Sequence, residues 1–433
     1  MSGETPRLTA PKKDVPANHE ETPAYRWVML ALSWLLYFAF GLIHTALSVL
    51  ITPVMDSLHL TYIQMGVILG SWQLVYIFFA QPAGVLIDHL GSYKSLFLGA
   101  AIVALSAALR GMAVNFESLL VFVALFGLGG PMISIGLPKL ASAWFTGKER
   151  GVATGVFTTG NSIGSIVALS LTHSIVLPLV GTWQGVFYAY SLIGLMITLL
   201  WLVVGRRSQH TTALGTTSRP RGETRPWTGM RQLFRSRNIW LIVIIGITSF
   251  LAGHGVPNWL PTILELKGMT GGEAGVAVSF LHVSGIAGSL LIPRLPYTLG
   301  SKKRAIALTL FTLGIAILML GVASSPLIWL AMIVAGATMR GLLPLLMVTL
   351  MDLPEVDSTQ MGVIGGLYFS IGEIGGFGGP FVMGLLMDVT GSFVAGIIFI
   401  AAVTEAAIIL VALLDVDDAT GDAAPSRAGS RTP

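Results

Sequence analysis

The sequence contains no cysteine and few charged residues. None of its 433 residues is Cys, and 11% are Asp, Glu, Lys or Arg. Without thiols the protein has no disulfide, no thiolate-bound metal, no iron–sulfur cluster and no cysteine nucleophile. The HExxH pattern of zinc peptidases and the GxxxxGK[ST] loop of nucleotide-binding proteins are also missing. We therefore expect neither an enzyme nor a bound metal or cofactor.

Apolar residues dominate the chain instead. They make up 54% of the sequence, and its mean hydropathy is +0.79. A helix needs ~20 apolar residues to cross the ~30 Å hydrocarbon core of a lipid bilayer. Twelve segments satisfy this requirement: 27–50, 63–87, 95–114, 118–142, 150–174, 183–204, 239–263, 273–296, 303–323, 326–351, 360–387 and 392–414. The sequence therefore predicts an all-α integral membrane protein with twelve transmembrane helices.

Basic residues are distributed unevenly over the loops between these segments. If the N-terminus is cytoplasmic, 22 of the 25 Lys and Arg residues lie on or near the cytoplasmic side. The exceptions are Lys267 on the opposite side, Arg110 near the outer end of its segment, and Arg340. This bias predicts a multi-pass plasma membrane (cell inner membrane) protein with both termini in the cytoplasm, and it explains the basic charge without nucleic acid. We expect Arg110 to snorkel to the outer surface and Lys139 to the inner surface.

Polar stretches divide the chain into five parts. We expect residues 1–24 and 415–433, which are polar and lack long apolar runs, to be disordered cytoplasmic tails. The stretch 205–238, rich in Ser, Thr, Pro and Arg, is typical of a cytoplasmic linker. It separates a six-helix bundle at 25–204 from a second six-helix bundle at 239–414.

The two halves of the chain also repeat weakly. A shift of 209 residues superposes Gly66 on Gly275 and Gln73 on His282. A shift of 211 residues aligns "ATGVFTTGNSIGS" with "IGGLYFSIGEIGG". Such internal symmetry is typical of transporters built from two related bundles, so we expect the bundles to be pseudo-symmetric.

The loop between the second and third segments carries a motif. Its sequence, "GVLIDHLGSYKS" (84–95), resembles the loop motif of the major facilitator superfamily and keeps Gly84, Asp88, Gly91 and Lys94. With the six-plus-six layout, the resemblance extends over about residues 25–414. It implies the major facilitator fold and a gating role, in which Asp88 latches the bundles at the cytoplasmic face. Alternatively, the motif only forms a tight turn with an interface anchor.

Three further stretches resemble a narrower branch of this superfamily, the cyanate and 2-nitroimidazole permeases. They are "ALRGMAVNFESLL" (108–120), "GLGGPMISIGLPKL" (127–140) and "HGVPNWLPTILELKGMTGGEAG" (254–275). This resemblance implies that the substrate is a small anion or a small polar heterocycle.

Arg340 lies in the middle of an otherwise apolar segment. It follows Pro326 by 14 residues, which is ~21 Å along a helix and therefore near the bilayer midplane. An arginine at this depth costs ~2.5–3.5 kcal/mol on the insertion scale, so it normally faces a partner or an aqueous cavity. Glu373 lies at equal depth on the next segment. Arg340 could bind an anion while Glu373 carries a proton, or the two could form a permanent structural ion pair.

Other polar residues within the segments are candidates for the same site. His254 lies near Pro257 and Pro261, which we expect to distort its helix and to expose backbone groups. The first segment carries a polar face that would be unfavourable against lipid. Besides Arg340, the candidates for substrate binding are His254, His282, Tyr37, His44, Asn161 and Gln73. For each of them, a hydrogen bond between helices is the alternative.

These features predict a secondary active transporter. We expect a monomer that moves a small organic or inorganic anion by rocking of the two bundles, with coupling to protons. One alternative is efflux of a small neutral or aromatic compound, with Arg340 and Glu373 permanently paired. Another is a membrane receptor that transports nothing. A channel is disfavoured because no filter-like loop or ring of like charges is recognisable.

Overall fold

The computed structural model describes residues 22–207, 235–323, 326–356 and 361–416. Within these ranges the protein is all-α, and twelve of its helices are long and apolar enough to cross a membrane. The all-α architecture with twelve spans that the sequence predicts is therefore confirmed. The predicted tails at 1–24 and 415–433, and the predicted linker at 205–238, lie largely outside the described residues.

Six of the long helices come from each half of the chain. The first six are α1 (Thr22–Val49), α3 (Tyr62–Leu90), α4 (Ser92–Arg110), α5 (Phe116–Trp144), α6 (Gly147–Leu171) and α8 (Trp183–Val204). The second six are α11 (Arg237–Leu266), α12 (Gly271–Leu291), α14 (Lys302–Val322), α15 (Leu327–Met351), α16 (Met361–Thr390) and α17 (Phe393–Ala412). Shorter elements connect or extend them: α2 (Ile51–Leu58), η1 (Thr172–Val176), α7 (Leu177–Val180), η2 (Gly205–Arg207), η3 (Ile292–Arg294) and α13 (Leu295–Leu299).

Local sequence signals set where several helices begin. Thr61, Asn115 and Thr270 form capping boxes at the starts of α3, α5 and α12, where each side chain accepts a hydrogen bond from the backbone three residues further on. These bonds satisfy N–H groups that the first turn of a helix leaves free. Between α3 and α4, Gly91 adopts a positive φ of 80°, which strains any residue with a side chain. This glycine therefore allows the abrupt turn between the two helices.

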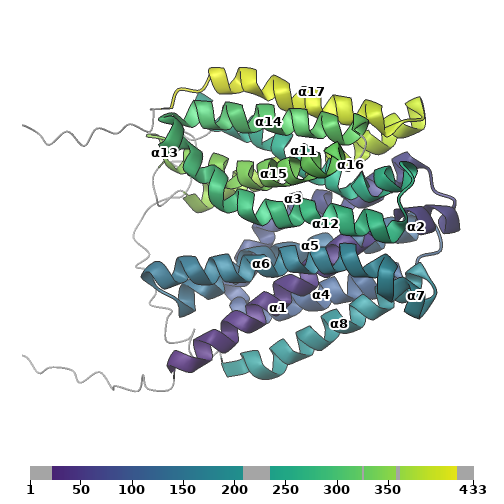
Figure 1. Cartoon of the computed structure of the whole chain (residues 1–433). Coiled ribbons are helices and arrows are strands. Elements are labelled where there is room, and N and C mark those ends of the chain that lie inside the picture. The colour runs from purple at the N-terminus through teal and green to yellow at the C-terminus, as the bar shows by residue number, and fades with distance from the viewer. Residues whose placement is uncertain (1–21, 208–234, 324–325, 357–360, 417–433) are drawn as a thin grey trace, which may run out of the picture.

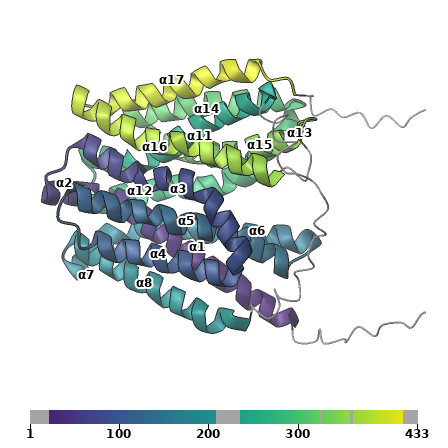
Figure 2. The same cartoon turned by 180° about the vertical axis from the view of Figure 1, so that it is seen from behind.

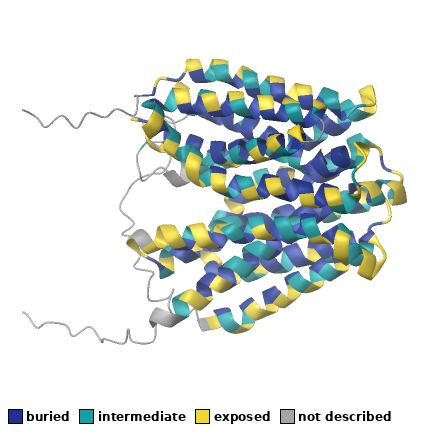
Figure 3. Ribbon diagram, in the orientation of Figure 1, coloured by how far each residue is buried: buried dark blue, intermediate teal, exposed yellow. Residues whose placement is uncertain are grey.

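The helices pack into two bundles that lie one above the other in Figure 1. The first bundle contains α1 to α8 and the second contains α11 to α17. Across the junction, α3 packs against α16 and α6 packs against α12, and Figure 2 shows the same two layers from behind. Buried residues gather inside the bundles and at their junction, whereas exposed residues line the outer surfaces and the loops (Figure 3). The outer surface carries large apolar side chains such as Phe78, as a lipid-facing surface requires.

Matching glycines bring helices into close contact in both bundles. On α6, a Cβ at Gly164 would clash with the Phe38 carbonyl of α1. On α16, a Cβ at Gly375 would clash in the same way with the Ile247 carbonyl of α11. The glycines are 211 residues apart and the carbonyls 209, which are the shifts found in the sequence. The two bundles therefore share this close helix contact, as pseudo-symmetry predicts.

The loop from α11 to α12 is anchored by Lys267. Its ammonium donates hydrogen bonds to the carbonyls of Leu320 (3.1 Å) and Ala323 (3.0 Å), at the C-terminal end of α14. A cation is favourable there because the last carbonyls of a helix carry partial negative charge. Partial burial lowers the pKa of Lys267 below its usual value. The lone lysine outside the positive-inside pattern thus has a structural role.

The glycine contact between α1 and α6 can be tested with one substitution and a control on the same helix. Because the obstructing atoms at Gly164 belong to backbone, Gly164→Ala should lower the free energy of unfolding by about 1–3 kcal/mol. Gly155→Ala has open space around its Cβ and should leave stability unchanged or slightly raised. Thermal unfolding in detergent measures both, and equal melting temperatures for the two variants would contradict the packing described.

Candidate functional site

Arg340 presents an accessible guanidinium halfway along α15. Its side chain is exposed although its helix neighbours Met339 and Gly341 are buried. The stem of the side chain packs against Gly285 of α12, where a Cβ would come within 2.6 Å of the Arg340 Cγ. No hydrogen bond or ion pair reaches the guanidinium from the described residues. The donors of Arg340 are therefore not used by any residue in the described part of the chain.

The electrostatic neighbours of Arg340 come from both bundles. They are Tyr37 and His44 of α1, His254 of α11 and His282 of α12. Since α1 belongs to the first bundle and the other helices to the second, the guanidinium lies between the bundles and not on the outer, lipid-facing surface. Five of the residues predicted for the site are thus brought together around one central position.

Arg340 and Glu373 do not pair directly, contrary to the partnership suggested by their equal depth. The nearest cationic or imidazole nitrogen to Glu373 is that of His254, with Nε2 3.8 Å from Oε2. The carboxylate also lies over Gly376, where a Cβ would clash with it. Depth along two helices does not determine the direction in which each side chain points, and Arg340 points toward α12 whereas Glu373 points toward α11 and α3. In this conformation the pair is therefore not a permanent structural lock.

His254 links the two bundles through its ring. Its Nδ1 lies 3.3 Å from Nε2 of Gln73, a fully buried residue of α3, and its Nε2 faces Glu373 of α16. The helix α11 continues through Pro257 and Pro261, so the prolines do not interrupt it. The His254 carbonyl accepts a hydrogen bond from the side chain of Asn258 (2.8 Å).

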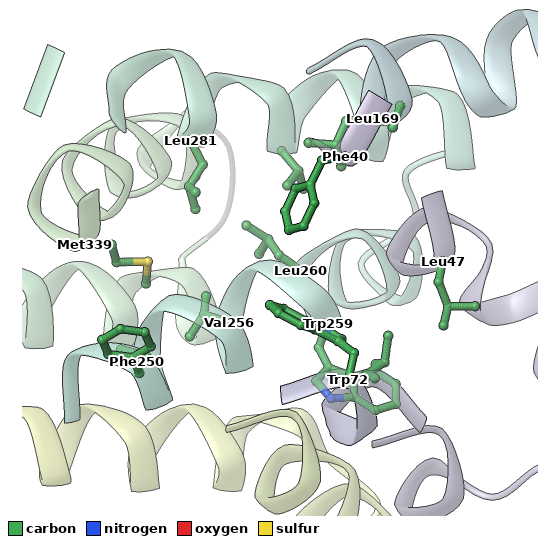
Figure 4. Close-up of a cluster of buried hydrophobic side chains, with 14 of the residues drawn as sticks. Phe40, Leu47, Trp72, Leu169, Phe250, Val256, Trp259, Leu260, Leu281 and Met339 are labelled. Atoms are coloured by element: carbon green, nitrogen blue, oxygen red, sulfur yellow. The ribbon is translucent and has the colours of Figure 1, made fainter. Parts of the chain in front are cut away.

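Aromatic rings surround the histidines. The His44 ring packs edge-on against Trp72 with centroids 5.0 Å apart, and lies 6.4 Å from the His254 ring. Phe250 stacks on His254 at 6.0 Å. Figure 4 shows Trp72 and Phe250 within the cluster of buried side chains at the centre of the molecule. This packing restricts both imidazoles to narrow orientations.

The other predicted site residues occupy the edges of this centre. Tyr37 is half-buried and packs against Phe157 of α6, with ring centroids 6.2 Å apart. Asn161 of α6 lies against Gly41 of α1, and its Oδ1 is buried without a hydrogen-bond partner in the described part of the chain. Asn161 is therefore an interface residue of the first bundle that still has an unused acceptor.

The gating motif makes its contacts within one bundle. Asp88 forms an ion pair with Lys139 of α5, which also belongs to the first bundle. Gly91 makes the turn, Lys94 is exposed, and a Cβ at Gly84 would meet no atom within 4 Å. Among the described residues, the latch between bundles that the resemblance implies is not formed in this conformation.

Two other intramembrane charges lie apart from the centre. Arg110 does not snorkel as expected, because it is 2% exposed, donates to the Ile43 carbonyl (3.2 Å) and lies 5.3 Å from the centre of the Phe126 ring. Its side chain turns into the first bundle, where a carbonyl and aromatic faces accommodate the charge. Glu405 of α17 packs against Gly314 of α14 at the periphery. Glu405 lies apart from the central site, whereas Arg110 acts on it only through the electrostatic interaction of its charge with His44.

Contacts that the sequence did not reveal join the bundles at one end of the molecule. We call this end, opposite the start of α1 and the end of α17, the distal face; it lies at the right of Figure 1. There, the Asp388 carboxylate of α16 accepts hydrogen bonds from the backbone of Tyr62 (3.1 Å) and Ile63 (2.7 Å) at the start of α3. Thr52 of α2 donates to Glu265 of α11 at 2.6 Å. In the sequence, the only signal for these contacts was that Asp388 and Glu265 each lie near the end of a predicted span.

The opposite, terminal face lacks such cross-links among the described residues. Besides Asp88, its ion pairs are Arg26 with Glu149 (2.8 Å) in the first bundle and Lys302 with Asp352 (3.0 Å) in the second. Every one of these pairs stays within a single bundle. Among residues 22–207, 235–323, 326–356 and 361–416, these polar contacts therefore join the bundles at the distal face and not at the terminal face.

Two bundles of six long helices thus meet around a central cation and are joined at the distal face. The sequence profile of the Major Facilitator Superfamily matches residues 33–380. The chain belongs to the major facilitator superfamily. It is accordingly a secondary transporter of the membrane and not an enzyme.

Individual proteins agree with this membership. The chain is 25% identical over 369 residues to the hexuronate transporter of Bacillus subtilis (strain 168), covering 81% of this chain and 85% of the relative. It is 28% identical over 262 residues to the probable L-galactonate transporter of Escherichia coli (strain K12), a match that spans 57% of this chain and only about half, 56%, of that relative. Its fold is similar to a bacterial homologue of the human lysosomal transporter Spinster in an inward-facing and occupied conformation, with a TM-score of 0.71, 15% identity, and 90% and 95% of the two chains covered.

The distal contacts generate a test that does not depend on the substrate. Asp388→Ala removes two hydrogen bonds to a charged acceptor, each of which contributes about 1.5–3 kcal/mol. The distal face should therefore open at least about tenfold more often. Because the chain has no native cysteine, Leu169→Cys, buried at the α6–α12 junction, can report opening through its rate of maleimide labelling. Asp352→Ala, which breaks an ion pair within one bundle, is the control, and equal labelling rates in the two backgrounds would refute the role of Asp388.

Proposed function

We propose that this protein carries a small anion, with an organic carboxylate favoured, across the plasma membrane. In this proposal the two bundles rock between two orientations, and transport is coupled to protons. The observation that carries the proposal is the accessible, unpartnered guanidinium of Arg340 between the bundles. A charged arginine at this depth is costly unless it meets water or an opposite charge. A carboxylate matches its planar fork with two parallel hydrogen bonds. We infer that Arg340 is the main anion-binding group.

The histidines and the tyrosine near Arg340 support the same class of substrate. The imidazoles of His44 and His282 and the hydroxyl of Tyr37 supply donors for a carboxylate or for hydroxyl groups beside it. The ring nitrogens of His254 face Gln73 and Glu373 instead, so His254 acts beside the substrate and not on it. The relatives are named for hexuronate and L-galactonate, which are sugar-derived carboxylates. The narrower resemblance to cyanate and 2-nitroimidazole permeases keeps small inorganic anions and small polar heterocycles within the range to be screened.

The orientation of the chain gives the observed conformation a functional meaning. We propose that both termini, and with them the linker between the bundles, lie in the cytoplasm, because Lys and Arg concentrate on that side. The distal face is then external and closed, and the site opens toward the cytoplasm. In the opposite state, we expect Asp88 to exchange Lys139 for a partner in the second bundle and so to close the terminal face.

Glu373 is the proposed proton carrier. Its carboxyl group is 5% exposed, and Oε2 has no hydrogen-bond partner in the described residues. A buried carboxyl group without a strong partner favours its neutral form, so it can take up and release a proton as its surroundings change. An anion at Arg340 changes those surroundings, which supplies the coupling. We propose that the monomer is sufficient, since one site lies within one chain.

Efflux of a neutral aromatic compound is the weaker alternative. It required a permanent pair of Arg340 and Glu373, and no such pair is present in this conformation. The aromatic rings near the centre also offer little free surface, since Trp72 is 7% exposed and Phe126 is 0% exposed. Counterflow distinguishes a carrier from a receptor and from a channel. A carrier exchanges substrate with saturation, whereas a receptor shows binding alone.

Anion binding can be tested at Arg340 by calorimetry or thermal shift with galactonate, hexuronates, cyanate and nitrate. Arg340→Gln should abolish binding, and Arg340→Lys should weaken it at least about tenfold, because a hydrogen bond to a charged group contributes about 1.5–3 kcal/mol and lysine lacks the planar fork. Arg294→Gln, an exposed arginine on η3, serves as the control with unchanged affinity. An unaltered Kd in Arg340→Gln would reject the proposed site.

Proton coupling has a separate test at Glu373 in proteoliposomes. Glu373→Gln cannot release a proton, so pH-driven accumulation should stop while substrate counterflow continues. Glu405→Gln replaces another intramembrane carboxyl group that lies on the peripheral helix α17, and it should behave like wild type. Intact pH-driven accumulation in Glu373→Gln would exclude this residue as the carrier.

A further inference from the structure

Three polar side chains form a chain across the junction between the bundles. Gln73 of α3 lies in the first bundle, and its Nε2 is 3.3 Å from Nδ1 of His254 in the second bundle. On the other side of the ring, His254 Nε2 is 3.8 Å from Oε2 of Glu373. Gln73 is fully buried, and the His254 side chain is 21% exposed. Two oxygen atoms of the chain, Gln73 Oε1 and Glu373 Oε2, are buried without a hydrogen-bond partner among the described residues.

The direction of the bond between Gln73 and His254 depends on the protonation of the ring. With the Gln73 amide nitrogen facing the ring, Nδ1 must accept, so the ring is neutral and its proton is on Nε2. When His254 takes up a second proton, Nδ1 becomes a donor and can no longer accept. A half-turn of the Gln73 amide then presents Oε1, the oxygen that lacks a partner, to the new N–H group.

We propose that Gln73 is a positioning residue that senses the protonation of His254 and transmits it from the second bundle to the first. This inference rests on the proton coupling proposed above, and it replaces substrate binding as the role of Gln73. A hydrogen bond from a charged imidazolium to an amide oxygen is roughly twice as strong as a neutral one. Protonation of His254 therefore strengthens the contact between the bundles and favours the conformation in which the distal face is closed.

One proton on the pair of His254 and Glu373 can occupy either residue. Neutral His254 with protonated Glu373 holds the same number of protons as charged His254 with ionised Glu373. Gln73 stabilises the second arrangement, because its oxygen accepts a stronger hydrogen bond from the charged ring than from the neutral Nδ1–H tautomer. The proton that Glu373 carries thus has a second position, and that position is the one the first bundle can detect.

The other ionisable groups around this pair set the sign of the coupling. The groups that face His254 are Glu373 of α16, His44 of α1 and Arg340 of α15. Around these, His282 of α12 and Arg110 of α4 lie near His44, and Tyr76 of α3 lies near Glu373. Arg340 is the permanent cation among the groups that face His254, and it opposes a charge on this ring. An anion bound to Arg340 cancels this opposition, so substrate and proton should assist each other's binding.

Packing keeps the three side chains in register. Phe250 stacks on the His254 ring at 6.0 Å, and Trp72 packs edge-on against it at 5.8 Å. Gly376 of α16 leaves room where Glu373 and Gln73 approach, since a Cβ there would lie 3.2 Å from Gln73 Cγ and would clash with the carboxylate. Because the ring is fixed, the rotation of the Gln73 amide is the smallest movement that accommodates a change of protonation.

The inference is tested by measuring the separation of the bundles as pH varies, without substrate. Leu179→Cys on α7 and Val389→Cys on α16, which are 80% and 72% exposed at the distal face, can carry spin labels in a chain that has no native cysteine. In this double-labelled protein, the distances between the two labels, measured by double electron–electron resonance, should shift toward the values of the closed distal face as pH falls. In Gln73→Leu, which keeps the volume but cannot sense the ring, the pH dependence of the distances should disappear.

Two further variants separate sensing from a general loss of packing. Ser71→Ala removes a buried hydroxyl of α3 whose bond stays within its own helix, and it should respond to pH like the unsubstituted double-labelled protein. Gln73→Glu offers the ring only acceptor oxygens and a negative charge, so the midpoint of the distance change should move upward by about one pH unit or more. If Gln73→Leu does not fold, the pH midpoint of the distance change in Gln73→Glu tests the inference by itself.

The inference is overturned if Gln73→Leu keeps the normal pH response, if Gln73→Glu leaves the midpoint unchanged, or if the parent protein does not respond to pH. Its failure is distinguishable from failure of the proposed function. Anion binding at Arg340 is judged by Kd, and proton-driven uptake by Glu373→Gln, whereas the distance measurement contains neither substrate nor a gradient.

Discussion

A guanidinium in the hydrocarbon layer must be surrounded by water, by protein acceptors or by an anion, and this requirement underlies the organisation of the molecule. Arg340 meets it by facing the junction of the two bundles, where no described residue occupies its donors. Arg110 meets the same requirement differently, through the Ile43 carbonyl and the ring of Phe126. Arg110 is thus satisfied by the protein, whereas Arg340 is the arginine that we propose binds a ligand.

The same low dielectric gives the neighbouring groups their importance. In such surroundings each unpartnered polar atom is costly, and the unused oxygens of Gln73 and Glu373 are the atoms on which the proposed sensing depends. The contacts of Asp388 and Glu265 are different in kind, because they are solvent-exposed hydrogen bonds that join the bundles at the distal face.

Much of the architecture could be predicted because it depends on local properties of the chain. The lengths of the apolar segments determine twelve spans, and the shifts of 209 and 211 residues predict the matched contacts of Gly164 and Gly375. Predictions failed where they required the direction of a side chain. Equal depth suggested a pair between Arg340 and Glu373, and proximity to a surface suggested that Arg110 snorkels. Both arguments measured height along a helix, whereas partners also depend on rotation about its axis.

By itself the sequence determined the class of protein, the number of spans, the internal repeat and the residues that cannot tolerate lipid, because hydrophobicity and charge act on each segment separately. Only the tertiary structure decided that His254 joins Gln73 to Glu373, that Asp88 pairs within its own bundle, and that Asp388 fastens the distal face. Those contacts arise between helices far apart in the chain, and their geometry follows from how the two bundles pack, which no single segment encodes.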